Sequence, residues 1–167
     1  MTVDRPEPPD VAPERQMLDG WLEFQRATLA RKCDGLTTGQ LREQAVPPSK
    51  LSLLGLVRHM AEVERNWFTM VLSGERGPFH YSSDDNPDGD FDVASADPDE
   101  AFATWRAECA DARQRAAAAP SLDVTGTTRR GEEVSLRWIM IHMIEEYARH
   151  NGHADLLRER IDGTVGV

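Results

Sequence analysis

Histidine is the residue type whose spacing in this chain points most directly to chemistry. The sequence contains five His, and three of them lie between residues 142 and 153 in a segment with helical periodicity. At about 100° per residue, these three and one Glu fall on one side of a helical wheel. The set consists of His142, Glu146, His150 and His153. The wheel places Trp138, Ile139, Leu156 and Leu157 on that same side and directs Asn151, Asp155 and Arg158 away from it. The sequence therefore predicts that these polar side chains share the core-facing stripe of a helix.

A carboxylate on a core-facing stripe needs a partner, because an unpaired buried charge costs several kcal/mol. Glu146 and His150 are four residues apart, which puts both groups on one side of a helix, one turn apart. A single helix can offer two metal ligands in this way. A third ligand is expected from another helix, and His59 is the candidate, since it lies in the apolar stripe of the segment around residues 53–72. The alternative is a buried His–Glu–Arg hydrogen-bond network in which Arg149 is the cation.

The remaining chemically active residues favour plainer interpretations. His80 lies in an irregular segment, where nothing in the sequence fixes it near the other His residues. Trp67 and Trp138 are interpreted as core residues in preference to substrate platforms. Cys33 and Cys109 have no CxxC partner, so both are predicted to be structural thiols.

Four amphipathic segments must position these side chains, and they predict an all-α four-helix bundle. The expected helices cover residues 13–32, 53–72, 98–119 and 136–160, with a short helical turn beginning at residue 38. Capping residues support these limits, including Ser52, the Asp97-Pro98 pair and Ser135. Residues 77–97 form a long irregular loop between the second and third helices, and such loops are often functional. Arg130-Gly131 is expected at the tip of a small hairpin.

Composition limits the partners and the number of domains. The 167 residues fit one domain, predicted over 14–167, preceded by a flexible Pro-rich and acidic arm at 1–13. The formal net charge of -10 argues against a nucleic-acid backbone or an anionic membrane as partner. The sequence has no secretory signal and no apolar run of about 18 residues, so a cytoplasmic protein without a membrane span is expected.

Two segments carry a family resemblance. LSLLGLVRHMAEVERNWF (51–68) and WIMIHMIEEYARHNGHADLLRERIDG (138–163) resemble the DinB/YfiT-like superfamily, in particular an actinobacterial branch long labelled as a domain of unknown function. The resemblance covers nearly the whole chain after the arm. It implies a DinB-like four-helix bundle that holds a divalent metal near one end, most often zinc, with nickel or iron as alternatives.

The resemblance also implies a ligand set. The family pattern places one His on the second helix and two His four residues apart on the fourth, which map to His59, to position 146 and to His150. Glu146 departs from this pattern, and the resulting His/Glu/His set is that of a relative, the mycothiol-dependent maleylpyruvate isomerase. His153 is then a fourth ligand, a hydrogen-bond donor to a ligand, or an acid/base group. His142 is expected to pack beside the site or to support it.

Family chemistry supplies the leading hypothesis, which is a metal-dependent S-transferase or isomerase that uses a small thiol, mycothiol, on an electrophilic substrate. Three protein ligands leave one zinc position open, and a metal-bound thiol loses its proton near neutral pH. The loop at 77–97 and the pair Arg129-Arg130 are expected to shape the cosubstrate pocket. A metal-dependent hydrolase that uses bound water and a non-catalytic metal-binding stress-response protein are the alternatives. Bundles of this type often dimerise, so a homodimer is left open.

Overall fold

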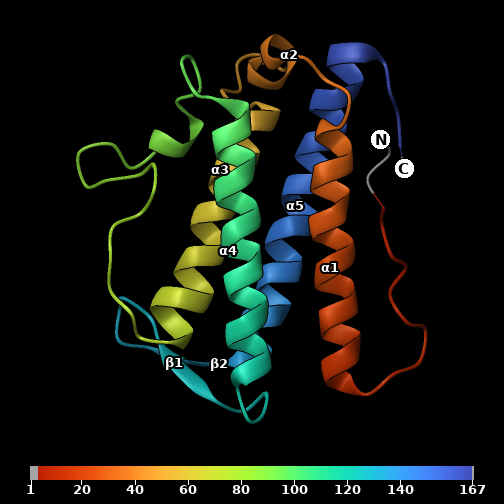
Figure 1. The fold of residues 1–167 in the computed structure, drawn as a ribbon. Helices are drawn as coiled ribbons and strands as arrows, with labels where there is room; N and C mark the ends of the chain where they lie inside the picture. The colour runs from red at the N-terminus through yellow and green to blue at the C-terminus, as the bar shows by residue number, and fades with distance from the viewer. Residues whose placement is uncertain (1–3, 167) are drawn as a thin grey trace.

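Four long helices pack side by side around one core in the computed structural model, which describes residues 4–166 (Figure 1). The helices are α1 (Glu14–Cys33), α3 (Leu53–Glu64) with its continuation η1 (Arg65–Leu72), α4 (Pro98–Ala118) and α5 (Leu136–Asp162). Shorter elements connect them: α2 (Thr38–Arg42), the 3₁₀ turn η2 (Gly89–Phe91), and the antiparallel strands β1 (Thr125–Thr127) and β2 (Glu133–Ser135). The predicted all-α, DinB-like fold is confirmed, and each long helix lies within about two residues of its predicted limits.

Local capping explains why the helices begin and end where they do. The Ser52 hydroxyl accepts a hydrogen bond from the Gly55 N–H, and the Ser135 hydroxyl accepts one from the Trp138 N–H. Asp97 caps α4 in the same way, with Pro98 at the first helical position, where no N–H is needed. Gly163 ends α5 with a positive φ of 80°, a conformation that costs glycine little.

The second half of the second long helix differs from the regular helix that the sequence predicts. Arg65–Leu72 is a π-helix, which holds more residues in each turn than an α-helix does. Phe68 and Thr69 are both buried there, and the Thr69 hydroxyl donates to a carboxylate oxygen of Asp111 on α4 at 2.9 Å. A uniform 100° wheel does not anticipate this change in the number of residues per turn.

The buried face of α5 is rotated from the face that the sequence predicts. The sequence predicts Trp138 and Leu156 in the core, yet they are 44% and 58% exposed. Asn151, expected to point away, is buried and donates to the side-chain and main-chain oxygens of Gln25 on α1. The buried side chains centre roughly 100° from His142 on the wheel, so His142, Glu146 and His153 are only partly buried at the rim of the bundle, whereas His150 is buried. The buried set is Leu136, Ile139, Met140, Met143, Tyr147, His150, Asn151, Ala154 and Leu157.

A polar network occupies the centre of the bundle. The Arg26 guanidinium donates to both carboxylate oxygens of Glu64, at 2.8 and 2.6 Å. The Tyr147 hydroxyl donates to the same carboxylate at 2.7 Å and accepts from the Trp105 indole at 2.9 Å. All four side chains are buried, so the network joins the four long helices through satisfied charges.

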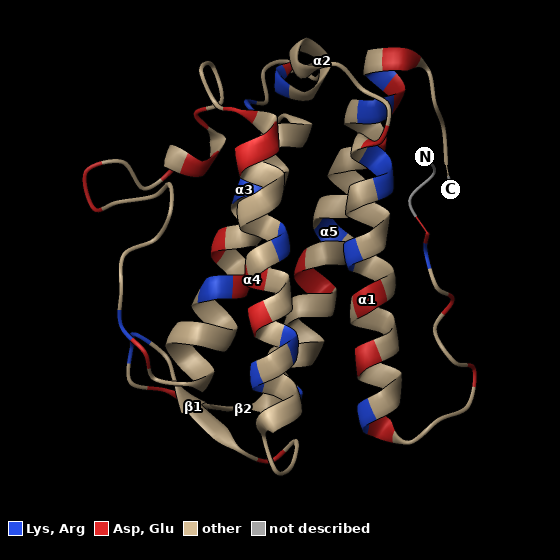
Figure 2. Ribbon diagram, in the orientation of Figure 1, with Lys and Arg blue, Asp and Glu red and all other residues tan. Residues whose placement is uncertain are grey.

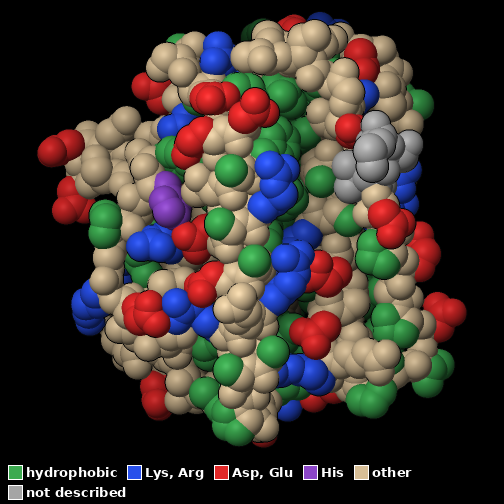
Figure 3. Space-filling view, in the orientation of Figure 1, with side chains coloured by type: hydrophobic (Ala, Val, Ile, Leu, Met, Phe, Trp, Pro, Cys, Tyr) green, Lys and Arg blue, Asp and Glu red, His purple; other side chains and the backbone are tan. Residues whose placement is uncertain are grey.

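The connections run over the outside of the bundle. The N-terminal stretch from Asp4 to Pro13 returns along α1, and the 1–3 part of the predicted arm lies outside the described residues (Figure 1). Charged residues of both signs line α1 and α4 (Figure 2), and acidic and basic side chains are interspersed over the face in Figure 3. None of the helices in residues 4–166 is both long and apolar enough to cross a lipid bilayer.

Candidate metal centre

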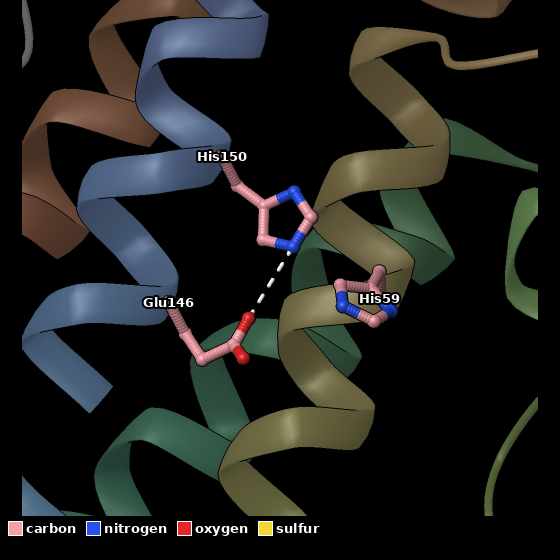
Figure 4. A group of neighbouring side chains, drawn as sticks. All are labelled: His59, Glu146 and His150. Carbon is pink, nitrogen blue, oxygen red and sulfur yellow. Dashed lines mark ion pairs between the residues drawn. The ribbon is translucent and has the colours of Figure 1, made fainter. Parts of the chain in front are cut away.

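Two neighbouring long helices bring the predicted ligands together. His59 comes from α3, and Glu146 and His150 come from α5, which runs antiparallel to it (Figure 4). One potential ligand atom from each residue lies within 4.8 Å of the others. The three side chains are partly or largely buried, so they form a rim site that is open to solvent on one side. This grouping is the three-residue set that the sequence spacing indicates.

Glu146 and His150 are already close to the separation that a shared metal ion requires. The Glu146 Oε2 and the His150 Nε2 are 3.4 Å apart. Two ligands on a tetrahedral zinc ion with bonds of about 2.1 Å are separated by about 3.4 Å. The other carboxylate oxygen accepts from Arg149 at 3.0 Å. Arg149 is half-exposed and also binds Glu145, so it is no buried counter-ion of the kind that the alternative network needs.

The outer nitrogen of His150 is held by His153. The Nδ1 atoms of the two rings are 3.3 Å apart, while the His150 Nε2 faces Glu146. Burial lowers the pKa of His150 to about 3, and His59 and His153 add to this effect. The ring is therefore neutral near pH 7, which is the form that binds a metal. His153 contacts the ring of His150 from outside the three-residue cluster.

Asp90 holds His59, and the sequence did not indicate this partner. The Asp90 Oδ2 lies 2.7 Å from the His59 Nδ1, and Phe91 stacks on the ring at 5.2 Å between centroids. The second ring nitrogen is turned toward Glu146 and His150 (Figure 4). A carboxylate on one nitrogen of a histidine fixes the proton there and leaves the other nitrogen free for a metal. Asp90 is buried in the 3₁₀ turn η2, within the long loop.

Glu62 fixes the start of the segment that carries Asp90. Its carboxylate accepts hydrogen bonds from three successive main-chain N–H groups, those of His80, Tyr81 and Ser82, at 2.7 to 3.1 Å. The main chain at Gly89 also packs closely against the main chain at Tyr81, since a Cβ at Gly89 would lie 2.2 Å from the Tyr81 carbonyl oxygen. The loop is therefore docked on α3 one helical turn beyond His59.

His80 itself is not brought to the cluster. Its Nε2 lies 2.7 Å from a carboxylate oxygen of Glu108 on α4, and Arg65 donates to the same oxygen at 3.2 Å. The contact between His80 and Glu108 anchors the loop to α4. His80 thus belongs to the docking of the loop and lies outside the group formed by His59, Glu146 and His150.

Three aromatic rings lie beside Glu146, which corrects the interpretation of Trp138 as a core residue. Trp138 stacks on His142 with 4.8 Å between centroids, and Trp67 meets both rings at 5.1 and 4.7 Å. The His142 Nε2 lies 3.6 Å from the Glu146 Oε1. His142, Glu145 and Glu146 form a second group of potential ligand atoms, which shares Glu146 with the first group; its Glu145 is exposed and paired with Arg149.

Neither cysteine offers a reactive thiolate. Cys33 and Cys109 are buried free thiols, and burial raises the pKa of Cys33 to about 12. Burial, together with the charge of Glu64, raises the pKa of Cys109 further. Because both thiols stay protonated near neutral pH, thiol chemistry at this site needs a thiol supplied from outside the chain.

A cavity of about 620 Å³ lies at the end of η1, and Met70, Arg76 and Arg129 are among its lining residues. None of the three clustered ligand candidates lines it. The Arg129 guanidinium also lies over the ring of Phe79, 4.7 Å from its centroid. Arg129 thus lines a cavity that is separate from the group of His59, Glu146 and His150.

The fold and the cluster together define an all-α, DinB-like bundle with a His/Glu/His group where α3 meets α5. The family model described as Mycothiol-S-transferase matches residues 17–163, so the chain belongs to this family. The family lies within the DinB/YfiT-like superfamily, and the resemblance in the sequence is thereby confirmed. No curated protein matches the chain.

Proposed function

We propose that the protein is a metal-dependent mycothiol S-transferase whose metal is held by His59, Glu146 and His150. The observation that carries the proposal is the convergence of these donors, within 4.8 Å of one another, in a member of the mycothiol S-transferase family. Two imidazoles and one carboxylate are a ligand set that zinc accepts, and nickel and iron accept it too. Three protein ligands leave one position for a cosubstrate.

A metal bound there supplies a positive centre that favours the thiolate form of a thiol near neutral pH. The chain's own residues prepare this position. Asp90 holds the proton of His59 on Nδ1, and His153 orients His150 from its outer nitrogen, so we assign His153 a positioning role. Glu146 contributes one negative charge, which leaves a divalent ion with a net positive charge.

The proposed reaction is S-conjugation. The thiol releases its proton to solvent, the thiolate sulfur forms a bond to an electrophilic carbon, and the leaving group departs with its electron pair. The low reactivity of Cys33 and Cys109 supports this scheme, because neither competes with the external thiol. A cytoplasmic location, where such a thiol is reduced, is part of the proposal.

Metal analysis and a conjugation assay test this proposal together. Wild-type protein, His59→Ala, His150→Ala and the control His80→Ala are purified and their metal content is measured. We expect about one metal per chain in the wild type and in His80→Ala, with loss in the other two variants. Stoichiometric metal in all four proteins would refute the ligand assignment.

Conjugation of mycothiol to a halodinitrobenzene then tests the activity. Product should form with the metal-loaded wild type and His80→Ala, and chelation should abolish it. Absence of product with mycothiol would count against the transferase. Turnover of an ester or amide without any thiol would instead favour a hydrolase that uses bound water.

A further inference from the structure

A platform of three aromatic rings lies on the metal side of the bundle, and we define it as Trp67, Trp138 and His142. The rings contact one another at 4.7 to 5.1 Å between centroids, and Trp138 and His142 are nearly parallel at 16°. His142 joins the platform to Glu146 through a distance of 3.6 Å from Nε2 to Oε1. The platform is therefore continuous with the candidate metal centre.

Trp138 has a large solvent-facing surface, since 44% of the residue is exposed. Exposure alone does not mark a ligand site, since Trp21 on α1 is 42% exposed. Trp138 differs because its exposed ring stacks on His142, which lies 3.6 Å from Glu146, and an aromatic face of this kind can pack against a ligand. Ile141, one turn along α5, is 53% exposed and extends the apolar surface. Packing within the bundle does not explain this exposure.

The platform lies at a fixed distance from the metal ligands. Trp67 follows His59 by eight residues, and Trp138 precedes Glu146 by eight residues. Because α3 and α5 are antiparallel, both separations run in the same direction, and the eight residues of α5 rise by about 12 Å. A ligand that reaches from the two Trp rings to the cluster must carry its reactive group at one end and its rings at the other.

The polar residues around the platform fit hydroxyl groups. Glu145 Oε2 lies 3.6 Å from the His142 Nδ1, and Arg149 pairs with Glu145 at 2.6 Å. Planar charged side chains beside an exposed aromatic ring are suited to a polyol. The apolar C–H face of a sugar packs on the ring while its hydroxyls bond to the carboxylate or guanidinium.

Resting on the proposed function, we propose that the Trp67–Trp138–His142 platform binds the sugar part of the thiol cosubstrate. In mycothiol a cysteinyl group is joined to a glucosamine and an inositol ring. The cysteinyl sulfur would then reach the group of His59, Glu146 and His150, while the two rings lie on the platform. The ligand class is a polyhydroxylated pair of six-membered rings.

Binding of the thiol-free glucosaminyl-inositol to the purified protein, followed by calorimetry, tests the platform without any catalytic step. We expect saturable binding to the wild type and an affinity that falls about tenfold or more in Trp138→Ala. Trp138→Phe, which keeps an aromatic face, should fall between the two. Trp21→Ala is the matched control, since Trp21 is 42% exposed on α1, away from the site. Circular dichroism checks that each variant is folded.

Kinetics separates this inference from the transferase activity. In Trp138→Ala the KM for mycothiol should rise about tenfold, whereas the KM for N-acetylcysteine, which lacks the sugar, should not change. Active protein with equal mycothiol KM in wild type and Trp138→Ala would overturn the platform and leave the proposed function intact. Absence of sugar binding to the wild type would also overturn it. Trp138-dependent sugar binding without conjugation would support the platform and refute the transferase.

Discussion

Replacing Asp90 by Asn changes one atom in the hydrogen bond that orients His59. In the native site the Asp90 Oδ2 pairs with the His59 Nδ1 at 2.7 Å, and the Oδ1 accepts the Phe91 N–H at 3.1 Å. If the Asn oxygen stays on Phe91, its NH₂ group faces the Nδ1 and moves the imidazole proton to Nε2. That nitrogen is the one turned toward Glu146 and His150, and a protonated nitrogen cannot bind a metal.

In the opposite orientation the amide oxygen faces the His59 Nδ1, but the NH₂ group then faces the Phe91 N–H. Two hydrogen-bond donors would oppose each other there, so this orientation is also unfavourable. Asp90 is 4% exposed, so water does not repair either mismatch. Loss of such a partner of a metal ligand typically weakens metal binding by about 10- to 100-fold. We expect Asp90→Asn to bind zinc weaker by this factor, which corresponds to about 1.4–2.7 kcal/mol.

Competition with a chromophoric zinc chelator measures this affinity directly. Asp92→Asn is the control, since Asp92 is exposed two residues along the same loop and the substitution removes the same charge. Circular dichroism should show that both variants keep the wild-type fold. Equal zinc affinity in the wild type and Asp90→Asn, or equal losses in both variants, would refute the tautomer argument.

Three further substitutions or treatments have defined outcomes. Arg26→Met leaves the buried Glu64 carboxylate without its counter-ion and should lower the unfolding free energy in urea by about 3–5 kcal/mol. Gly152→Ala should raise the unfolding free energy by about 0.5–1 kcal/mol, since Gly152 is helical and a Cβ there meets no atom within 4 Å. Because burial raises the pKa of both Cys33 and Cys109, native protein at pH 8 should resist a thiol reagent that labels both after unfolding.

Matched controls make these outcomes specific. Arg113→Met breaks a partly exposed ion pair with Glu23, and Glu23 keeps its second partner Arg26, so the cost in urea should stay below about 1 kcal/mol. Similar losses for Arg26→Met and Arg113→Met would contradict a central role for the buried pair. A lower unfolding free energy in Gly152→Ala than in the wild type would show that a Cβ at this position of α5 clashes with neighbouring atoms. Rapid stoichiometric labelling of native protein would contradict the burial of the thiols.

Most of the fold follows from local signals in the sequence. Ser52, Asp97-Pro98 and Ser135 mark helix starts, and each is observed as a capping residue. These signals are readable because capping involves residues two or three positions apart. The π-helix at Arg65–Leu72 carries no such mark, since it depends on contacts with α4, including that of Thr69 with Asp111.

A helical wheel does not predict the rotation of α5, because the wheel places every apolar residue in the core. Trp138 and Leu156 shifted the predicted stripe toward His142, whereas Asn151 packs on α1 through its bonds to Gln25. The burial of Glu64 is not among the predictions from the sequence either, although its spacing from buried apolar residues indicates it. It lies four residues after Met60 and four before Phe68, both buried, so its position on the apolar stripe is visible in the sequence.

The grouping of His59, Glu146 and His150 could be inferred from spacing and family pattern, but the partner of His59 could not. Asp90 lies in an aperiodic loop that also contains Asp84, Asp85, Asp88 and Asp92. Nothing local distinguishes Asp90 from these four residues. Its role depends on where the docked loop places η2 against α3, which is a tertiary property.

The docking of this loop through Glu62 has a consequence for how such proteins diverge. The Glu62 carboxylate binds main-chain N–H groups at residues 80–82, and every residue except proline has such a group. This anchor therefore does not depend on which side chains stand at 80–82, although the His80 and Tyr81 side chains add contacts of their own with Glu108 and Glu100. Selection for new substrates can act on the loop surface without dismantling the site beneath it, and a directed library at residues 82–88 would exploit the same freedom.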